Sequence, residues 1–225
     1  MKIITFSYDD GVTQDRRLIE MLNKYGLKAT FNINSELLGT KNTLNCGGKT
    51  ISHHKIDPDE VAQLYAGHEV AVHTLTHPLL PRLTDDEVVR QVEEDRKRLS
   101  QLVGYEVVGM AYPCGGVQNS DRVEDLIRNR TGVKYARTIS LGYSFRHQDN
   151  LYRYKPTAFH LNLADNYFLA DEFFKSREDG IFYIWGHSYE LDINDTWDEF
   201  EKFCQYIAGR DDIVYATNAE ALLNL

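Results

Sequence analysis

The stretch TFSYDDGVTQ, residues 5–14, places two adjacent carboxylates, Asp9 and Asp10, at the end of a short apolar run that begins at Ile3. Neighbouring like charges repel, and the repulsion is costly where a buried strand ends away from water. A solvated Asp-Gly turn would explain the pair without any function. A bound cation, or a different task for each acid, would explain it as well. The partners that the rest of the chain supplies decide between these interpretations.

Short apolar runs alternate with longer amphipathic segments, which is the pattern of parallel strands joined by crossover helices. We expect strands at residues 2–8, 27–34, 68–74, 107–113, 133–139, 180–188 and 214–217, and helices at 14–26, 57–66, 83–104, 120–132, 167–178, 196–209 and 219–223. The clearest helix has Thr84 as N-cap, Glu87 completing a capping box, and Gly104 at its end. Residues 39–57 are expected to form an irregular surface loop.

Composition narrows the class of protein. With 225 residues and 42% hydrophobic content, the chain can form one large core, so we expect a single domain over residues 1–225. A net charge of -9 argues against nucleic acid as a partner. No apolar run has the length of a membrane span, and no export signal is visible in the chain as given, so a cytoplasmic location is expected. Three cysteines without a C-x-x-C pair argue against a disulfide framework or a thiolate zinc site.

Residues capable of chemistry recur at the carboxyl ends of the expected strands, where barrel enzymes carry their active sites. They are Asp9 and Asp10 after the first strand, His73 and His77 after the third, residues 113–116 after the fourth, and His187 after the strand GIFYIWGH. Four such strand ends are harder to explain by chance than any one of them. The sequence therefore predicts a site at this end of a (β/α) barrel.

The stretch HTLTH, residues 73–77, holds two histidines four positions apart. A helical zinc motif would carry a glutamate after the first histidine, but Thr74 stands there, and Pro78 disfavours a helix. Two unrelated histidines, one in the core and one on the surface, are the bland alternative. Together with Asp10, the pair would instead form a one-carboxylate, two-imidazole set that suits a divalent cation with an open position.

The motifs YDDG, HTLTH, AYPCGG and IWGH, in this order, resemble those of the polysaccharide deacetylase family, the carbohydrate esterases that share the NodB homology domain. The resemblance extends over nearly the whole chain. It implies a deformed (β/α) barrel of about seven parallel strands. It also implies a metal-dependent hydrolase in which a metal-activated water removes an N- or O-linked acetyl group from an acetylated sugar or oligosaccharide.

The resemblance also implies a role for each motif residue. Asp9 corresponds to the general base, and His187 to the general acid. Asp10, His73 and His77 correspond to the metal ligands. This ligand set favours one divalent ion, zinc first, although Co²⁺, Ni²⁺, Mn²⁺ or Fe²⁺ would also fit.

Other residues are expected to contact the substrate. The turn from Pro113 to Gly115 would supply a backbone N–H for the oxyanion, with Cys114 as the expected donor. Trp185 and Tyr189 would offer a surface to a sugar ring or an acetyl methyl group, unless they are simply core residues.

The chain departs from the family pattern in two places. Ala111 stands where the family has an arginine that orients the catalytic aspartate, so either another cation takes that role or the role is not filled. The candidates are Arg137, Lys155 and Arg153, of which we favour Arg153. The aspartate-tryptophan motif that supports the acid histidine is also not visible.

Substitutes for that supporting motif are His160 and Asp165, and His160 is also a candidate for substrate binding. A purely structural role for His160 is the alternative. His53 and His54 lie in the expected surface loop and should face solvent, unless the loop lies over the site and contacts substrate.

Two other functions remain open on the sequence alone. One is a related amidohydrolase acting on cyclic ureides or imides, and the complete set of Asp10, His73 and His77 argues against it. The other is a catalytically impaired carbohydrate-binding barrel. Binding needs neither a base nor an acid, so Asp9 and His187 argue against this second alternative. The missing arginine at position 111 favours it.

Overall fold

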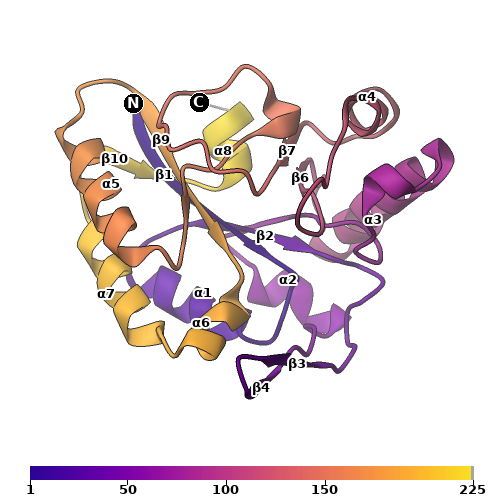
Figure 1. Cartoon of the computed structure of the whole chain (residues 1–225), viewed down its shortest axis with the longest axis horizontal. Helices are drawn as coiled ribbons and strands as arrows, with labels where there is room; N and C mark the ends of the chain where they lie inside the picture. The colour runs from indigo at the N-terminus through magenta and orange to yellow at the C-terminus, as the bar shows by residue number, and fades with distance from the viewer. Residues whose placement is uncertain (224–225) are drawn as a thin grey trace.

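The computed structural model describes residues 1–223, which fold around one parallel sheet (Figure 1). The hydrogen-bonded path through the sheet is β7-β6-β5-β2-β1-β9-β8, and β10 pairs with the first half of β1. The strands are β1 (Lys2–Asp9), β2 (Ala29–Ile33), β5 (Glu69–Val72), β6 (Gly109–Ala111), β7 (Tyr135–Arg137), β8 (Ala158–Phe159), β9 (Gly180–Gly186) and β10 (Ile213–Tyr215). The parallel α/β architecture predicted from the alternating pattern is confirmed.

The segment leading into β8 links the two ends of this path. Tyr154 donates its N–H to the Ala136 carbonyl and accepts from the N–H of Thr138, both at 2.9 Å. Three residues later, Thr157 donates to the carbonyl of Tyr183 in β9 at 2.8 Å. The sheet therefore curls into a barrel, which brings the carboxyl ends of its strands together.

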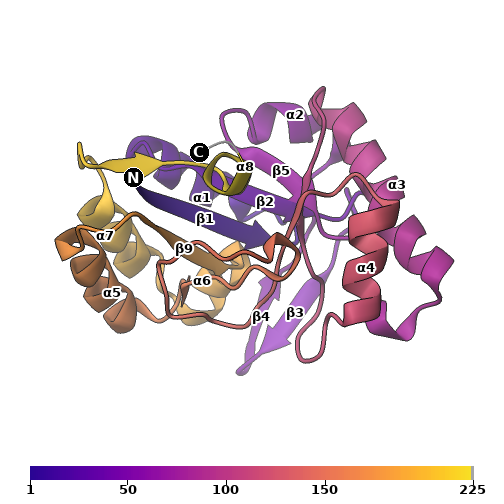
Figure 2. The ribbon, with the colours of Figure 1, turned by 90° about the horizontal axis from the view of Figure 1, so that it is seen from above.

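Helices surround the sheet: α1 (Asp15–Lys24), α2 (Val61–Leu64), α3 (Asp85–Val103), α4 (Asp121–Arg130), α5 (Leu163–Lys175), α6 (Ser188–Asn194), α7 (Trp197–Ile207) and α8 (Asn218–Leu223). Figures 1 and 2 show α5 packed beside α7 at one end of the sheet and α3 beside α4 at the other. Leu18, Ile19 and Leu22 of α1 are buried, as their helical spacing predicts. No helix within residues 1–223 has both the length and the apolar character needed to cross a bilayer.

The ends of α3 agree in part with those predicted from the sequence. The Thr84 side chain accepts the N–H of Glu87, and Gly104 ends the helix with a left-handed backbone (φ 77°). The second half of the predicted capping box is wrong. The carboxylate of Glu87 instead accepts two hydrogen bonds from Arg90, at 2.7 and 2.8 Å.

Residues 39–57 are more ordered than expected, because they contain the antiparallel hairpin β3 (Thr43–Cys46) and β4 (Lys49–Ser52). Gly47 and Gly48 form its tip, with φ of 57° and 80°. Left-handed backbone at both positions is what a two-residue hairpin turn requires, and glycine adopts it at little cost. The Gly-Gly pair was therefore the signal for the hairpin. The short elements β8 and α6 were not predicted either.

The last residue of β9, Gly186, lies so close to His160 that only a glycine leaves room for the His160 ring. A Cβ at this position would collide with the His160 imidazole. We therefore expect Gly186→Ala to lower the free energy of unfolding by about 1–3 kcal/mol, the usual effect of overpacking a core. Urea denaturation measures this. Gly115→Ala is the control, because its Cβ would meet no heavy atom within 4 Å. Equal stability of the two variants would contradict the prediction.

Candidate active site

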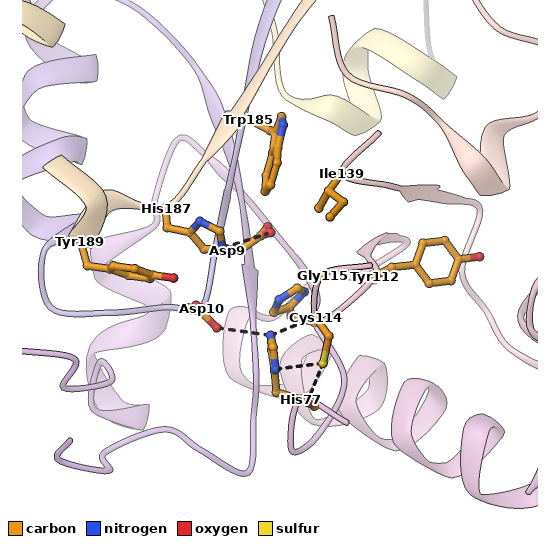
Figure 3. Close-up of a pocket in the computed structure, with 11 residues that line it drawn as sticks. Asp9, Asp10, His77, Tyr112, Cys114, Gly115, Ile139, Trp185, His187 and Tyr189 are labelled. Carbon is orange, nitrogen blue, oxygen red and sulfur yellow. Dashed lines mark hydrogen bonds and ion pairs between the residues drawn. The ribbon is translucent and has the colours of Figure 1, made fainter. Parts of the chain in front are cut away.

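The carboxyl ends of β1, β5, β6 and β9 meet around one pocket of about 280 Å³ (Figure 3). Its walls are formed by Asp9, Asp10, His73, His77, Tyr112, Cys114, Gly115, Ile139, Trp185, His187 and Tyr189. The structure thus brings together residues from all four motifs, from Asp9 near the start of the chain to His187 near its end.

Asp10, His73 and His77 form a cluster that could hold a metal ion. One ligand atom from each lies within 4.8 Å of the others, and the Asp10 Oδ1 atom is 3.8 Å from Nε2 of His77. Nδ1 of His73 lies 2.9 Å from the Ala111 carbonyl, so this nitrogen donates and Nε2 keeps its lone pair for an ion. The donor set fits a divalent cation.

Burial keeps both imidazoles neutral, as metal ligands must be. It lowers the pKa of His73 to about 4 and lowers the pKa of His77 as well. For Asp10, burial acts in the opposite direction. A hydrogen bond from His53 and the charge of Lys55 nevertheless hold the pKa of this carboxyl well below its usual value. All three side chains are therefore in the protonation state that coordination requires.

Left-handed backbone is concentrated at the site, although the residues concerned are not glycine: Asp10 (φ 85°), Thr74 (69°), His77 (61°) and Cys114 (68°). Such conformations cost on the order of 1 kcal/mol each and persist where the surroundings enforce them. Thr74 helps to enforce them, because its hydroxyl accepts the N–H of His77 at 3.1 Å. Asn34 adds hydrogen bonds to the carbonyls of His73 and Thr74, at 2.6 and 2.9 Å.

Asp9 is buried and held by Arg137, whose Nη2 contacts both carboxylate oxygens. Asn32 donates a further hydrogen bond to Oδ1 at 2.9 Å. Arg137 lies in β7 directly opposite Ala111 of β6 in the parallel register. A guanidinium from the neighbouring strand therefore occupies the place expected for an arginine at position 111.

The prediction that Arg153 holds Asp9 is wrong. Its guanidinium is in ion pairs with Asp121 at 2.6 Å and Glu124 at 2.7 Å, on the outside of the barrel. Arg137 was one of the candidates considered, but the sequence does not reveal which strand lies beside β6.

His187 lies opposite Asp9, with 3.9 Å between Nε2 and Oδ2 (Figure 3). Its Nδ1 is 3.1 Å from Oε2 of Glu190, one turn along α6. Burial would lower the pKa of His187, but Glu190, followed by the charges of Asp9 and Asp10, raises it to about 9. Glu190 is itself half-buried, which would raise its pKa, yet its hydrogen bonds with both histidines hold that pKa at about 2.

His160 is fully buried and does not reach the pocket, so the prediction that it binds substrate is wrong. Its Nε2 lies 2.9 Å from Oε2 of Glu190, the same oxygen that faces His187. His160 therefore contacts the carboxylate that also holds His187. Asp165, the other residue considered as a support for His187, is exposed on α5.

The remaining predicted contacts lie around the turn after β6 and on β9. Cys114 and Gly115 line the pocket, whereas Pro113 is buried behind the turn. The N–H of Cys114 points towards Nε2 of His77, at 3.5 Å. Trp185 lines the pocket with its ring directed at the centre, while its Nε1 points away (Figure 3).

Two residues of the segment after β4 reach the site, and one of them, His53, was expected to face solvent. The Nε2 atom of His53 is 3.6 Å from Oδ2 of Asp10, and the His53 ring packs edge-on against Tyr189. Lys55 is buried and contacts Asp10 directly. His54 lies further out, against Asn42 of the hairpin.

Comparison with known proteins identifies the family of the chain. A sequence model described as "Polysaccharide deacetylase" matches residues 1–136, more than half of the chain. The chain belongs to the polysaccharide deacetylase family. The membership that the four motifs predicted is thereby confirmed.

Similar members of the family are bacterial. The peptidoglycan-N-acetylmuramic acid deacetylase PdaC of Bacillus subtilis strain 168 is 27% identical over 123 residues, which make up 54% of this chain. The matched region is only 23% of that longer protein.

Solved structures of the family share the fold. Peptidoglycan deacetylase PdaC from Bacillus subtilis superposes with a TM-score of 0.57 at 20% identity, over 97% of this chain and 89% of that chain. A polysaccharide deacetylase from Bacillus cereus gives a TM-score of 0.57 at 15% identity, over 98% and 94% of the two chains. These likenesses confirm the deformed (β/α) barrel of this family.

The site includes residues that sequence reasoning missed. Glu190 follows His187 by three positions, the spacing of one helical turn, and this spacing was the available signal. Lys55 gave no such signal, because a lone lysine in a polar loop is usually solvated. Only the pairing of the chain around Gly11 brings Lys55 to Asp10.

Removal of Arg137 would leave Asp9 as a buried charge without a cation. We expect Arg137→Ala to lower the free energy of unfolding by about 3–5 kcal/mol. Arg153→Ala, which breaks two ion pairs of a partly exposed guanidinium, should cost less, at most about 1 kcal/mol. Chemical denaturation measures both.

The parallel register suggests a rescue of this loss. Because Ala111 lies opposite Arg137, the double variant Ala111→Arg/Arg137→Ala should recover part of the lost stability. The assignment of Arg137 as the counter-charge of Asp9 would be overturned by equal losses in Arg137→Ala and Arg153→Ala.

Proposed function

We propose that the chain is a metal-dependent hydrolase that removes N- or O-linked acetyl groups from a carbohydrate, through a single catalytic domain over residues 1–225. One observation carries this proposal. A triad able to bind a cation, a carboxylate held by arginine and a histidine held by glutamate all face one pocket. The names of the relatives make an acetylated oligosaccharide such as a peptidoglycan fragment the first substrate to test.

Asp10, His73 and His77 would hold the ion, with zinc as the first candidate from the ligand types. A divalent cation bound there would polarise the substrate carbonyl and make a water molecule more acidic. The protein contributes the geometry, because the ring of His73 is fixed by the Ala111 carbonyl before any ion binds.

Asp9 is proposed as the general base. Its Oδ1 is occupied by hydrogen bonds from Asn32 and Arg137, while Oδ2 also faces His187 across the pocket. The Arg137 contact fixes the plane of the carboxylate, so a proton acceptor is held in position at the pocket wall. This placement meets the first condition for general-base catalysis, which is reach.

His187 is proposed as the general acid that protonates the departing sugar nitrogen or oxygen. A pKa of about 9 means that the imidazole carries its proton at neutral pH and can donate it. Glu190 accounts for this state, since its carboxylate lies 3.1 Å from Nδ1 and leaves Nε2 facing the pocket.

Two features would recognise the acetyl group. The backbone N–H of Cys114, which points towards Nε2 of the pocket residue His77, could donate to the developing oxyanion. Trp185 and Ile139 offer apolar surface for the methyl group on the same wall of the pocket.

The alternative of a catalytically impaired barrel rested on the missing arginine at position 111. Arg137 supplies a guanidinium at the same place and removes that objection. The cyclic ureide alternative lacks a specific observation in its favour, because the pocket retains the complete cation-binding triad.

Metal analysis tests the ligand assignment. We expect about one divalent ion per chain, and a sharp loss of binding in Asp10→Asn, His73→Ala and His77→Ala. Asp9→Asn is the matched control: it should retain the ion and lose on the order of 100-fold in turnover, the usual loss on removing a general base. If Asp9→Asn loses the ion while Asp10→Asn keeps it, the two roles are reversed.

The pH profile tests the acid. Because His187 must be protonated to act, deacetylation of a sugar should hold at neutral pH and fall as the pH rises through about 9. Glu190→Gln removes the carboxylate that raises this pKa, so the fall in activity should move to lower pH.

A comparison of leaving groups tests the same role. His187→Ala should lose far more activity on an acetylated sugar than on an aryl acetate, whose leaving group hardly needs a proton. Equal losses on both substrates would refute the role of His187 as acid.

A further inference from the structure

Lys55 places an ammonium group directly against the proposed metal ligand Asp10. Its Nζ donates to the Asp10 carbonyl oxygen at 2.7 Å and lies 3.3 Å from the carboxylate Oδ1 atom. The Lys55 side chain is only 6% exposed, and that of Asp10 only 10%. A lysine this deeply buried is rare unless it is paired.

The backbone fixes this contact. Lys55 forms an antiparallel bridge with Val12, and on either side of it the chain is pinned to the turn after β1. His54 accepts the N–H of Thr13 at 2.8 Å, and Ile56 donates to the Gly11 carbonyl at 2.9 Å. The ammonium therefore sits beside Asp10 because the chain is paired there, and not through a chance rotamer of a surface side chain.

The charges around the two aspartates divide into separate pairs. Asp9 is neutralised by Arg137. Asp10 has Lys55 and two imidazoles, those of His53 and His77, within 4.0 Å. Within residues 1–223, Lys55 is the only lysine or arginine at ion-pair distance from Asp10, so it is the permanent counter-charge of that carboxylate.

We propose that Lys55 is a built-in counter-ion of the metal site: its charge balances that of Asp10 before an ion binds, and it lowers the affinity of the site for that ion. This inference rests on the proposed role of Asp10 as a metal ligand. An ion bound to the carboxylate would lie a few ångströms from the ammonium, and like charges at that separation repel strongly in a buried setting. A carboxylate already shared with Lys55 also donates less charge to the ion, which leaves the ion more electrophilic.

A merely structural role for Lys55 makes the opposite prediction. Asp10 has a left-handed backbone, and the Lys55 ammonium satisfies its buried carbonyl. If that were all, removing the ammonium would disorder Asp10 and weaken metal binding. The direction of the change in affinity therefore separates the two roles.

The experiment compares Lys55→Met, Lys55→Arg and the surface control Lys49→Met. Lys49 is exposed and donates to the Ile193 carbonyl of α6. Dissociation constants for Zn²⁺ and Mn²⁺ are measured on the full chain by competition with a chromophoric chelator at neutral pH. We expect Lys55→Met to bind both ions at least about 10-fold more tightly, because a like charge a few ångströms away is removed. Lys55→Arg and Lys49→Met keep the local charge and should stay close to wild type.

Unchanged or weaker binding in Lys55→Met would overturn the proposal. Lys55→Gln is the second variant, for the case that Lys55→Met does not fold. It is also neutral, can still donate a hydrogen bond, and must bind the ions more tightly than wild type for the proposal to stand. A wild-type chain that binds neither ion would refute the proposed metal site itself. A wild-type chain that binds them, with no gain in the neutral variants, would refute only the role of Lys55.

Discussion

Burial of two adjacent carboxylates at the end of β1 is the constraint on which the rest of the site depends. Side by side and away from water, Asp9 and Asp10 would each lose several kcal/mol of hydration without compensation. The fold gives each acid its own cation: Arg137 reaches Asp9 from β7, and Lys55 reaches Asp10 from the segment after the hairpin. Because the two cations come from opposite sides, the two acids have distinct environments and can take on distinct tasks.

Backbone geometry turns this electrostatic arrangement into a pocket. Consecutive side chains of a strand point to opposite faces, so Asp9 and Asp10 could not both face one pocket if β1 simply continued. The strand ends at Asp9, and the left-handed conformation of Asp10 redirects the second carboxylate. Similar turns occur at His77 and Cys114. Conformational strain is thus concentrated where function needs unusual side-chain directions, and it is supported by the hydrogen bonds of the neighbouring strands.

The sequence predicted what depends on order along the chain. The alternation of strands and helices, the cluster of Asp10, His73 and His77, and the position of His187 all follow from motifs at strand ends. It did not predict what depends on neighbours across the sheet. Arg153 was preferred over Arg137 because the sequence around these residues does not reveal which strands are neighbours in the sheet. His53 was expected in solvent because its segment was interpreted as an irregular loop, whereas the glycine pair at 47–48 closes a hairpin whose exit leads back to the site.

The register that sets Ala111 beside Arg137 bears on how activity is inferred from alignments. Two residues facing each other on adjacent parallel strands start from nearly the same point in space, so a long side chain at either position can deliver its charge to the same place. An alignment compares one column at a time. At position 111 it would show that the arginine is missing and would suggest an inactive enzyme. A comparison of the paired positions on β6 and β7 shows instead that the arginine stands on the neighbouring strand. Surveys that sort such proteins by single alignment columns would therefore count as lost a charge that has only moved by one strand.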